Sequence, residues 1–137
     1  MAMPRKKKPI GHCSAVIFAK DVGRVEAFYA AVLGVTAGER DDDHVVLDLG
    51  GIELVVHQLS RAAAARIEIA TPPVPRANTA IKPVFVVPSL ERARTAAAAH
   101  GGALKSVDEE WTIRGEQVCD GIDPEGNVIQ FRQSGSK

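Results

Sequence analysis

The side chains that could do chemistry are few, and the histidines come first. His57 follows Glu53 by four residues in the apolar segment 52–59, and alternate side chains of a strand share one face. A carboxylate and an imidazole on one face could both bind a metal ion, and Glu53 could also act as a general base. His44 stands beside three aspartates, and His100 ends an alanine-rich segment. We expect these two imidazoles to lie in solvent.

The two cysteines, Cys13 and Cys119, are too few for a disulfide framework, which favours a reduced, cytoplasmic protein. No histidine is placed by spacing beside Cys119, so we interpret it as a small core residue and not as a nucleophile. Trp111 is the single tryptophan, and it could stack on a flat ligand or pack between two parts of the fold. The sequence contains no G-x-S-x-G, no C-x-x-C and no glycine pattern for phosphate binding.

Composition excludes several classes of partner. The 137 residues carry 17 basic and 17 acidic side chains, so the formal net charge is zero. Broad nucleic-acid binding needs a basic face, and no apolar run reaches the roughly 18 residues of a membrane span. We therefore expect neither a nucleic-acid nor a membrane partner. Residues 1–9 carry a basic cluster, which we interpret as a disordered, solubilising arm.

Signals for strands and a helix occur first in residues 10–59. Asp21 is suited to cap a helix, apolar residues then recur every three or four positions, and Gly34 is suited to end it. Strand candidates lie on both sides of this helix, and the last two are joined by a Gly-Gly hairpin turn. The four candidates are residues 13–19, 35–39, 44–50 and 52–59.

The same order returns in residues 80–133, after a proline-rich linker at 60–79 that also holds a short alanine-rich helical turn. Ser89 is suited to cap the second helix and Gly101-Gly102 to end it. A strand candidate at 83–87 precedes this helix, and a loop with a weak strand at 104–111 and candidates at 112–119 and 127–132 follow it. Asp21 and Ser89 are 68 residues apart, and so are Gly34 and Gly102. This repeat predicts an α+β fold of two βαβββ modules in one compact domain.

These segments are similar to the vicinal oxygen chelate superfamily, which includes glyoxalases, bleomycin-resistance proteins and ring-cleaving dioxygenases. VIFAKDVGRVEAFYAAVLGV resembles its strand, aspartate, and helix with Phe-Tyr and Leu-Gly, and CDGIDPEGNVIQFRQ resembles its turn before the last strand. The resemblance implies eight strands in curved sheets around a cleft, and a homodimer. It does not choose the reaction, because function varies widely on this fold.

In metal-dependent members of this superfamily, each module supplies one metal ligand from its first strand and one from its last strand. The resemblance assigns these positions to Ser14, Glu53, Lys82 and Gln130. Only Glu53 is an ordinary metal ligand, and a lysine ammonium at about 4 Å repels a cation by roughly 4 kcal/mol. We therefore expect no metal there, and the fallback metal set is His12, Glu53 and His57.

The leading hypothesis is a protein that binds a small organic molecule in its cleft, with no cofactor expected and a divalent metal left open. Glu53 and Lys82 are expected to form an ion pair. The alternative is a lyase, isomerase or dioxygenase that uses an atypical metal set or Glu53 as its base, so whether the protein is an enzyme stays open. The residues expected to line the cavity are Ser14, Glu53, His57, Lys82, Trp111 and Gln130.

Overall fold

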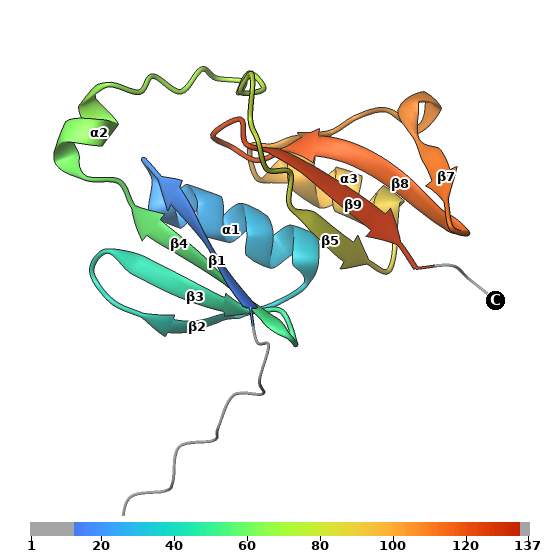
Figure 1. Cartoon of the computed structure of the whole chain (residues 1–137), viewed down its shortest axis with the longest axis horizontal. Coiled ribbons are helices and arrows are strands. Elements are labelled where there is room, and N and C mark those ends of the chain that lie inside the picture. The colour runs from blue at the N-terminus through green and yellow to red at the C-terminus, as the bar shows by residue number, and fades with distance from the viewer. Residues whose placement is uncertain (1–12, 135–137) are drawn as a thin grey trace, which may run out of the picture.

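A computed structural model describes residues 13–134 and contains two modules, each with one strand, one α-helix and then further strands (Figure 1). The basic arm at 1–9 and His12 lie outside the described residues. The first module contains β1 (Cys13–Ala19), α1 (Val22–Leu33), β2 (Ala37–Arg40), β3 (His44–Asp48) and β4 (Ile52–Gln58). The second, after α2 (Arg61–Ala65), contains β5 (Val84–Val87), α3 (Leu90–Ala99), β6 (Ala103–Leu104), the 3-10 helix η1 (Val107–Glu109), β7 (Trp111–Ile113), β8 (Glu116–Ile122) and β9 (Val128–Gln133).

Each module folds its strands into one sheet, which confirms the predicted fold class. The first sheet has the order β1-β4-β3-β2, and the second has the order β5-β9-β8-β6 with β7 also paired to β8. The first strand of each module runs parallel to its last strand, and the other pairs are antiparallel. The helix between first and second strands makes this parallel pairing feasible.

One strand prediction was wrong, and the count of eight strands with it. The segment predicted as a single strand at 112–119 contains a turn, because Arg114 (φ 51°) and Gly115 (φ 78°) both adopt left-handed backbone conformations. Strand β7 ends before this turn and β8 begins after it. Strand β8 then continues to Ile122 and so includes Asp120, which lies just beyond the end of the predicted strand.

The helix ends follow the predicted capping residues. The carboxylate of Asp21 accepts a hydrogen bond from the backbone N–H of Arg24, and the hydroxyl of Ser89 accepts one from Arg92. Gly34 ends α1 with a left-handed conformation (φ 68°). The two helix starts therefore have the same local structure, 68 residues apart, as the repeat predicted.

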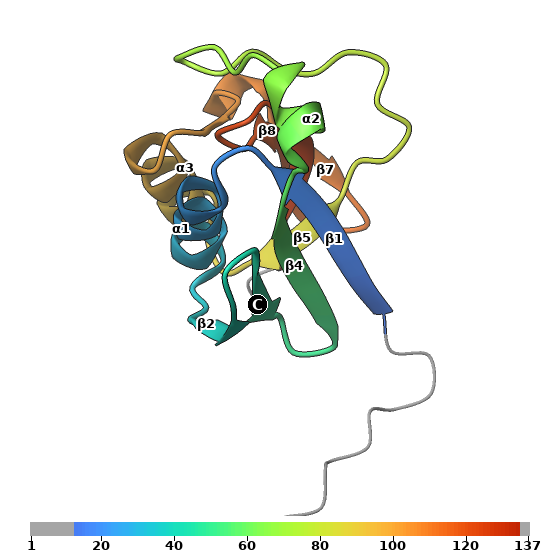
Figure 2. The same ribbon diagram turned by 90° about the vertical axis from the view of Figure 1, so that its left-hand side faces the viewer.

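Helices α1 and α3 lie side by side and cover one face of the sheets (Figure 2). Phe28 and Tyr29 of α1 and Phe131 of β9 are among the largest fully buried side chains of this core. We call the other face of each sheet its open face. Figures 1 and 2 together show both open faces turned to the same side of the molecule. No helix among the described residues is long and apolar enough to cross a membrane.

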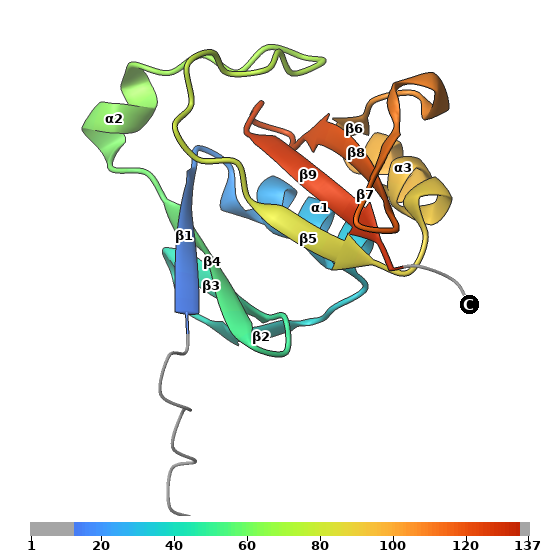
Figure 3. The same cartoon turned by 45° about the vertical axis from the view of Figure 1, so that its right-hand side comes forward.

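The turn between β8 and β9 connects the two modules. Each carboxylate oxygen of the buried Glu125 accepts a backbone N–H, from Lys20 and from Asp21, both at 2.8 Å. The hydroxyl of Tyr29 donates to the buried carboxylate of Asp123 at 2.8 Å. Thus the two stretches that carry the family resemblance contact each other. The linker runs from α2 across this end of the molecule to β5 (Figure 3), and Arg76 attaches it to the same turn.

Candidate functional site

The open face of the first sheet carries Ser14 and Glu53 as direct neighbours. Strands β1 and β4 are parallel, and their register places these two residues opposite each other. The Ser14 hydroxyl donates to Oε1 of Glu53 at 3.3 Å. His57 lies on the same face but at the far end of β4, where the register places it beside Phe18 of β1 and His44 of β3. The predicted shared face of Glu53 and His57 is therefore present, with the two residues at its opposite ends.

The open face of the second sheet carries a polar cluster centred on Asp120. Lys82 lies just before β5, and its Nζ is 3.2 Å from Oδ2 of Asp120. The side-chain amide of Gln130 donates to Oδ1 of the same carboxylate, also at 3.2 Å. The guanidinium Nε of Arg132 in turn donates to Oε1 of Gln130 at 3.1 Å. One cation thus contacts the carboxylate directly and a second is linked to it through Gln130, and we call these four residues the Asp120 cluster.

The structure corrects the expected partner of Lys82. Among the described residues Lys82 pairs with Asp120 and not with Glu53, because β8 extends far enough to bring Asp120 beside β9. Asp120 was missed because this strand was predicted to end at Cys119. A signal existed: Asp120 and Gln130 lie at equal distances from the centre of the turn at 123–127, so they pair in an antiparallel hairpin.

The six residues predicted to line one cavity fall into two groups within the chain. Hydrogen bonds join Ser14 to Glu53, and they join Lys82 to Gln130 through Asp120. Trp111 lies on β7 opposite Val118, and it is 39% exposed. That all six line a single cavity stays a prediction.

The residues at the family's metal positions do not suit a divalent cation. The hydroxyl of Ser14 is a weak neutral ligand, and Lys82 is an ammonium held beside Asp120. The amide oxygen of Gln130 already accepts a hydrogen bond from the Arg132 guanidinium. Glu53 is thus the one ordinary metal ligand among the four positions, and the Lys82 ammonium offers a cation no lone pair.

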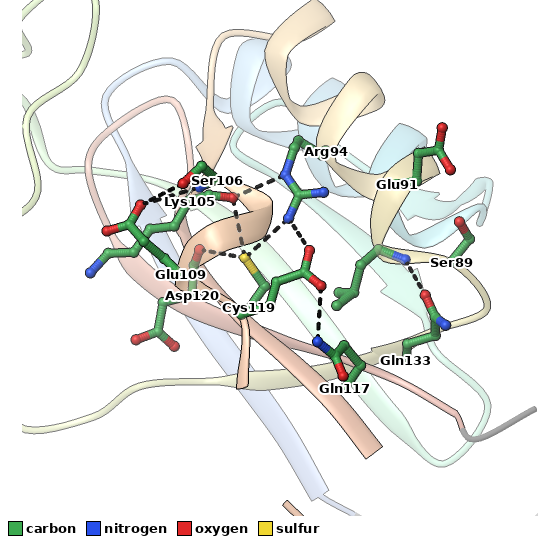
Figure 4. A network of polar contacts seen from close by, with 12 residues as sticks. Ser89, Glu91, Arg94, Lys105, Ser106, Glu109, Gln117, Cys119, Asp120 and Gln133 are labelled. Atoms are coloured by element: carbon green, nitrogen blue, oxygen red, sulfur yellow. Dashed lines mark hydrogen bonds and ion pairs between the residues drawn. The ribbon is translucent and has the colours of Figure 1, made fainter. Parts of the chain in front are cut away.

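Cys119 belongs to the core, as the sequence predicted. Its side chain is fully buried, and its sulfur lies 3.5 Å from Nη2 of Arg94. Burial raises the pKa of the Cys119 thiol, although the nearby guanidinium opposes that change. Figure 4 shows the sulfur directed toward Arg94 and the carbonyl of Lys105, while the carboxylate of Asp120 points the other way. Side-chain alternation along β8 explains both directions.

His44 departs from the expectation that it lies in solvent. Its side chain is only 25% exposed, and its Nδ1 lies 2.9 Å from Oδ1 of Asp43 and 2.8 Å from Oδ1 of Asp41. The hydrogen bond to Asp43 raises the pKa of His44, and the charge of Asp41 acts in the same direction. His100 does lie at the exposed end of α3, as expected.

Paired βαβββ modules, each with a parallel first and last strand, define the fold of the vicinal oxygen chelate proteins. The family model described as "Glyoxalase-like domain" matches residues 14–131. This chain therefore belongs to the glyoxalase-like domain family. No curated protein matches the sequence.

Solved structures of similar fold come from several bacteria. A glyoxalase/bleomycin resistance protein/dioxygenase family enzyme from Burkholderia phytofirmans is 20% identical, with TM-score 0.64 and coverage of 88% of this chain and 95% of that chain. A glyoxalase/bleomycin resistance protein from Albidiferax ferrireducens is 15% identical, with TM-score 0.63 and coverage of 91% and 98%. A lactoylglutathione lyase from Agrobacterium tumefaciens is 20% identical, with TM-score 0.57 and coverage of 92% and 95%. At these identities the likeness is one of fold.

Proposed function

We propose that this protein binds a small organic molecule, bearing a carboxylate or a polarised carbonyl, without a metal at the family's ligand positions. The Asp120 cluster is the observation that supports this most. The Lys82 side chain is 41% exposed, so its ammonium can reach a ligand oxygen while it stays beside Asp120. The amide of Gln130 and the guanidinium of Arg132 add donors on the same face. Glu53, on the other sheet, would accept a hydrogen bond from the ligand.

Apolar side chains beside the cluster would contact the rest of the ligand. The register places Val84 beside Gln130 and Val86 beside Arg132. Val84 and Val86 are 43% and 64% exposed, and Trp111 lies on the same sheet. An exposed apolar group next to a few polar donors is the composition typical of a small-molecule site. Trp111 would stack on a flat ligand.

Exposed apolar side chains on both sheets support a homodimer. Val16 and Phe18 are 50% and 55% exposed on the open face of the first sheet, as Val84 and Val86 are exposed on that of the second. Large exposed apolar surfaces commonly mark interaction sites. A second copy covering this side would also turn the open faces into an enclosed cleft. Light scattering at micromolar concentration is expected to give about twice 14.6 kDa, and a monomer at that concentration would contradict the dimer.

A binding titration tests the small-molecule proposal. We would screen small aromatic carboxylic acids by Trp111 fluorescence and by amide NMR shifts, and then compare Lys82→Met with the charge-matched control Arg61→Met on α2. A hydrogen bond to a charged group contributes about 1.5–3 kcal/mol, so Lys82→Met is expected to weaken binding roughly 10- to 100-fold. Arg61→Met is expected to leave the affinity unchanged.

Two results would refute this proposal. The first is ligand binding that Lys82→Met leaves unaffected, or NMR shifts confined to surfaces away from the Asp120 cluster. The second is a stoichiometric metal in protein purified without chelator that is lost in Glu53→Gln, since that metal would lie at a family position. The second result would favour the metal-dependent enzyme.

A further inference from the structure

A group of imidazoles and carboxylates lies at the far end of the first sheet, where β3 begins and β4 ends. Strands β3 and β4 are antiparallel, and their register pairs His44 with His57. The two imidazole rings are stacked, with centroids 5.7 Å apart and planes only 6° from parallel. Asp43 lies between them: Oδ1 is 2.9 Å from Nδ1 of His44, and Oδ2 is 3.9 Å from Nε2 of His57.

The hydrogen bonds of His57 determine which ring nitrogen can bind a metal. Its Nδ1 lies 2.8 Å from the backbone carbonyl of Gln58. A carbonyl only accepts hydrogen bonds, so Nδ1 carries the proton and Nε2 keeps its lone pair. Metal-binding histidines are typically oriented in this way, by a hydrogen bond from the other ring nitrogen to a backbone carbonyl or carboxylate. Nε2, the nitrogen with the lone pair, is the ring nitrogen that faces Asp43.

The backbone fixes Asp43 and His44 in place before any ion binds. The carboxylate of Asp41 accepts the backbone N–H groups of both residues, at 3.0 and 3.2 Å. The carbonyl of Asp43 also accepts the backbone N–H of Gln58, which ties the loop to the end of β4. Asp41 therefore shapes the turn, and the side chain of Asp43 remains 58% exposed and able to rotate.

We propose that Asp43, His44 and His57 form a binding site for a divalent transition-metal ion of the Zn²⁺ or Ni²⁺ type. One ligand atom from each of the three residues lies within 4.8 Å of the others. Zn–N bonds of about 2.0–2.1 Å place neighbouring ligand atoms roughly 3.4 Å apart, so binding requires rotation of the Asp43 side chain and of the two imidazole rings, whose nearly parallel planes must turn toward one ion. Two imidazoles and one carboxylate suit such ions and not Mg²⁺ or Ca²⁺, which prefer oxygen ligands. The ion would bind Nδ1 of His44 in place of a proton, and the imidazole would then carry its one proton on Nε2.

This site differs from the family's metal position and from the set of His12, Glu53 and His57. Four residues separate Glu53 from His57 along β4, which corresponds to about 13 Å. The new site takes its other two ligands from β3 and the turn before it, which are not among the family's ligand strands. Three protein ligands also leave a coordination position for water or a further ligand.

The test uses the full chain, purified in chelator and then dialysed free of it. A calorimetric titration with Ni²⁺ or Zn²⁺ alone is expected to show that one ion binds per chain. We expect metal affinity to fall in each of three variants, Asp43→Asn, His44→Gln and His57→Gln. Loss of a residue that only hydrogen-bonds to a metal ligand typically costs roughly 10- to 100-fold in affinity, and loss of a ligand itself should cost more. His100→Gln is the matched control for losing one imidazole, and it is expected to bind as the wild type does.

Glu53→Gln separates this inference from the proposed function. It is expected to leave the titration unchanged, because Glu53 is distant from the new site. The ring ¹⁵N resonances of His44 and His57 should shift on addition of Zn²⁺ while that of His100 does not, which reports the site even if a variant folds poorly. Absence of stoichiometric binding by the wild type would overturn the inference. So would binding that Glu53→Gln abolishes and that Asp43→Asn and His44→Gln leave intact.

Discussion

Glu125 makes the most direct connection between the two modules, so its removal should be costly. Its side chain is 3% exposed, and its two oxygens accept the backbone N–H groups of Lys20 and Asp21 at 2.8 Å each. Glu125→Ala leaves both N–H groups without this acceptor at the start of α1. Hydrogen bonds to a charged group contribute about 1.5–3 kcal/mol each, and the free energy of unfolding is expected to fall by about 3–5 kcal/mol. Glu125→Gln keeps one accepting oxygen and is expected to lose about half as much.

Urea unfolding at fixed protein concentration measures this change, because any dimer would make the stability depend on concentration. For a chain of this length 1 kcal/mol corresponds to roughly 3–4 °C in Tm, so Glu125→Ala should melt more than about 10 °C lower. The exposed Glu39 on β2 is the control, and Glu39→Ala is expected to change the unfolding free energy by less than about 0.5 kcal/mol. If Glu125→Ala lies within about 1 kcal/mol of the wild type, the modules are held by apolar packing alone and the reasoning fails.

Three further predictions follow from the core and the open faces. Burial, and then the charge of Asp123, raises the pKa of Tyr29 above its usual value near 10, so the folded state retains the phenol proton. The contribution of protonated Tyr29 to the free energy of unfolding should therefore be fully present below pH 10 and should be lost as the pH rises above 10. Urea titrations at several pH values should show this loss in the wild type and not in Tyr29→Phe. A Cβ at Gly102 would lie 2.4 Å from a ring carbon of Phe28, so Gly102→Ala should lower Tm strongly, whereas Gly51→Ala, with no atom within 4 Å, should not. Ser14→His, Lys82→His and Gln130→Glu together would introduce the family's usual metal ligands around Glu53. Calorimetry should show metal binding that depends on Glu53 only when all three are present. The measurement uses a variant in which His57 is also replaced, so that the site of His44 and His57 does not contribute.

The elements of the fold were predictable because their signals are local. Helix caps act within three residues, so Asp21 and Ser89 identify the helix starts without any knowledge of the rest of the chain. Apolar periodicity likewise identifies the buried face of α1. The β7–β8 turn was missed because Arg114 supplies one of its two left-handed residues, and arginine is not a residue that marks such turns.

The polar clusters were harder to predict, because they depend on register between segments. Asp120 meets Gln130 only if β8 continues past Cys119, and a strand end is the least certain feature of a sequence-based assignment. His44 and His57 are separated by a full hairpin, and their pairing depends on the hairpin turn lying at Gly50 and Gly51. A shift of one residue would have put one imidazole on the helix-covered face.

The contacts around Glu125 and Tyr29 also explain why the sequence identifies the family and not the reaction. The stretches that carry the resemblance meet each other at the junction of the modules, where they cap α1 and satisfy buried carboxylates. These contacts hold the two sheets in position whatever the open faces carry. The residues of the two proposed sites lie elsewhere: Lys82 and Asp120 on an open face, and His44 and His57 where β3 begins and β4 ends. None of these four residues takes part in the contacts of Glu125 and Tyr29, so substitutions at them would leave the junction of the modules intact.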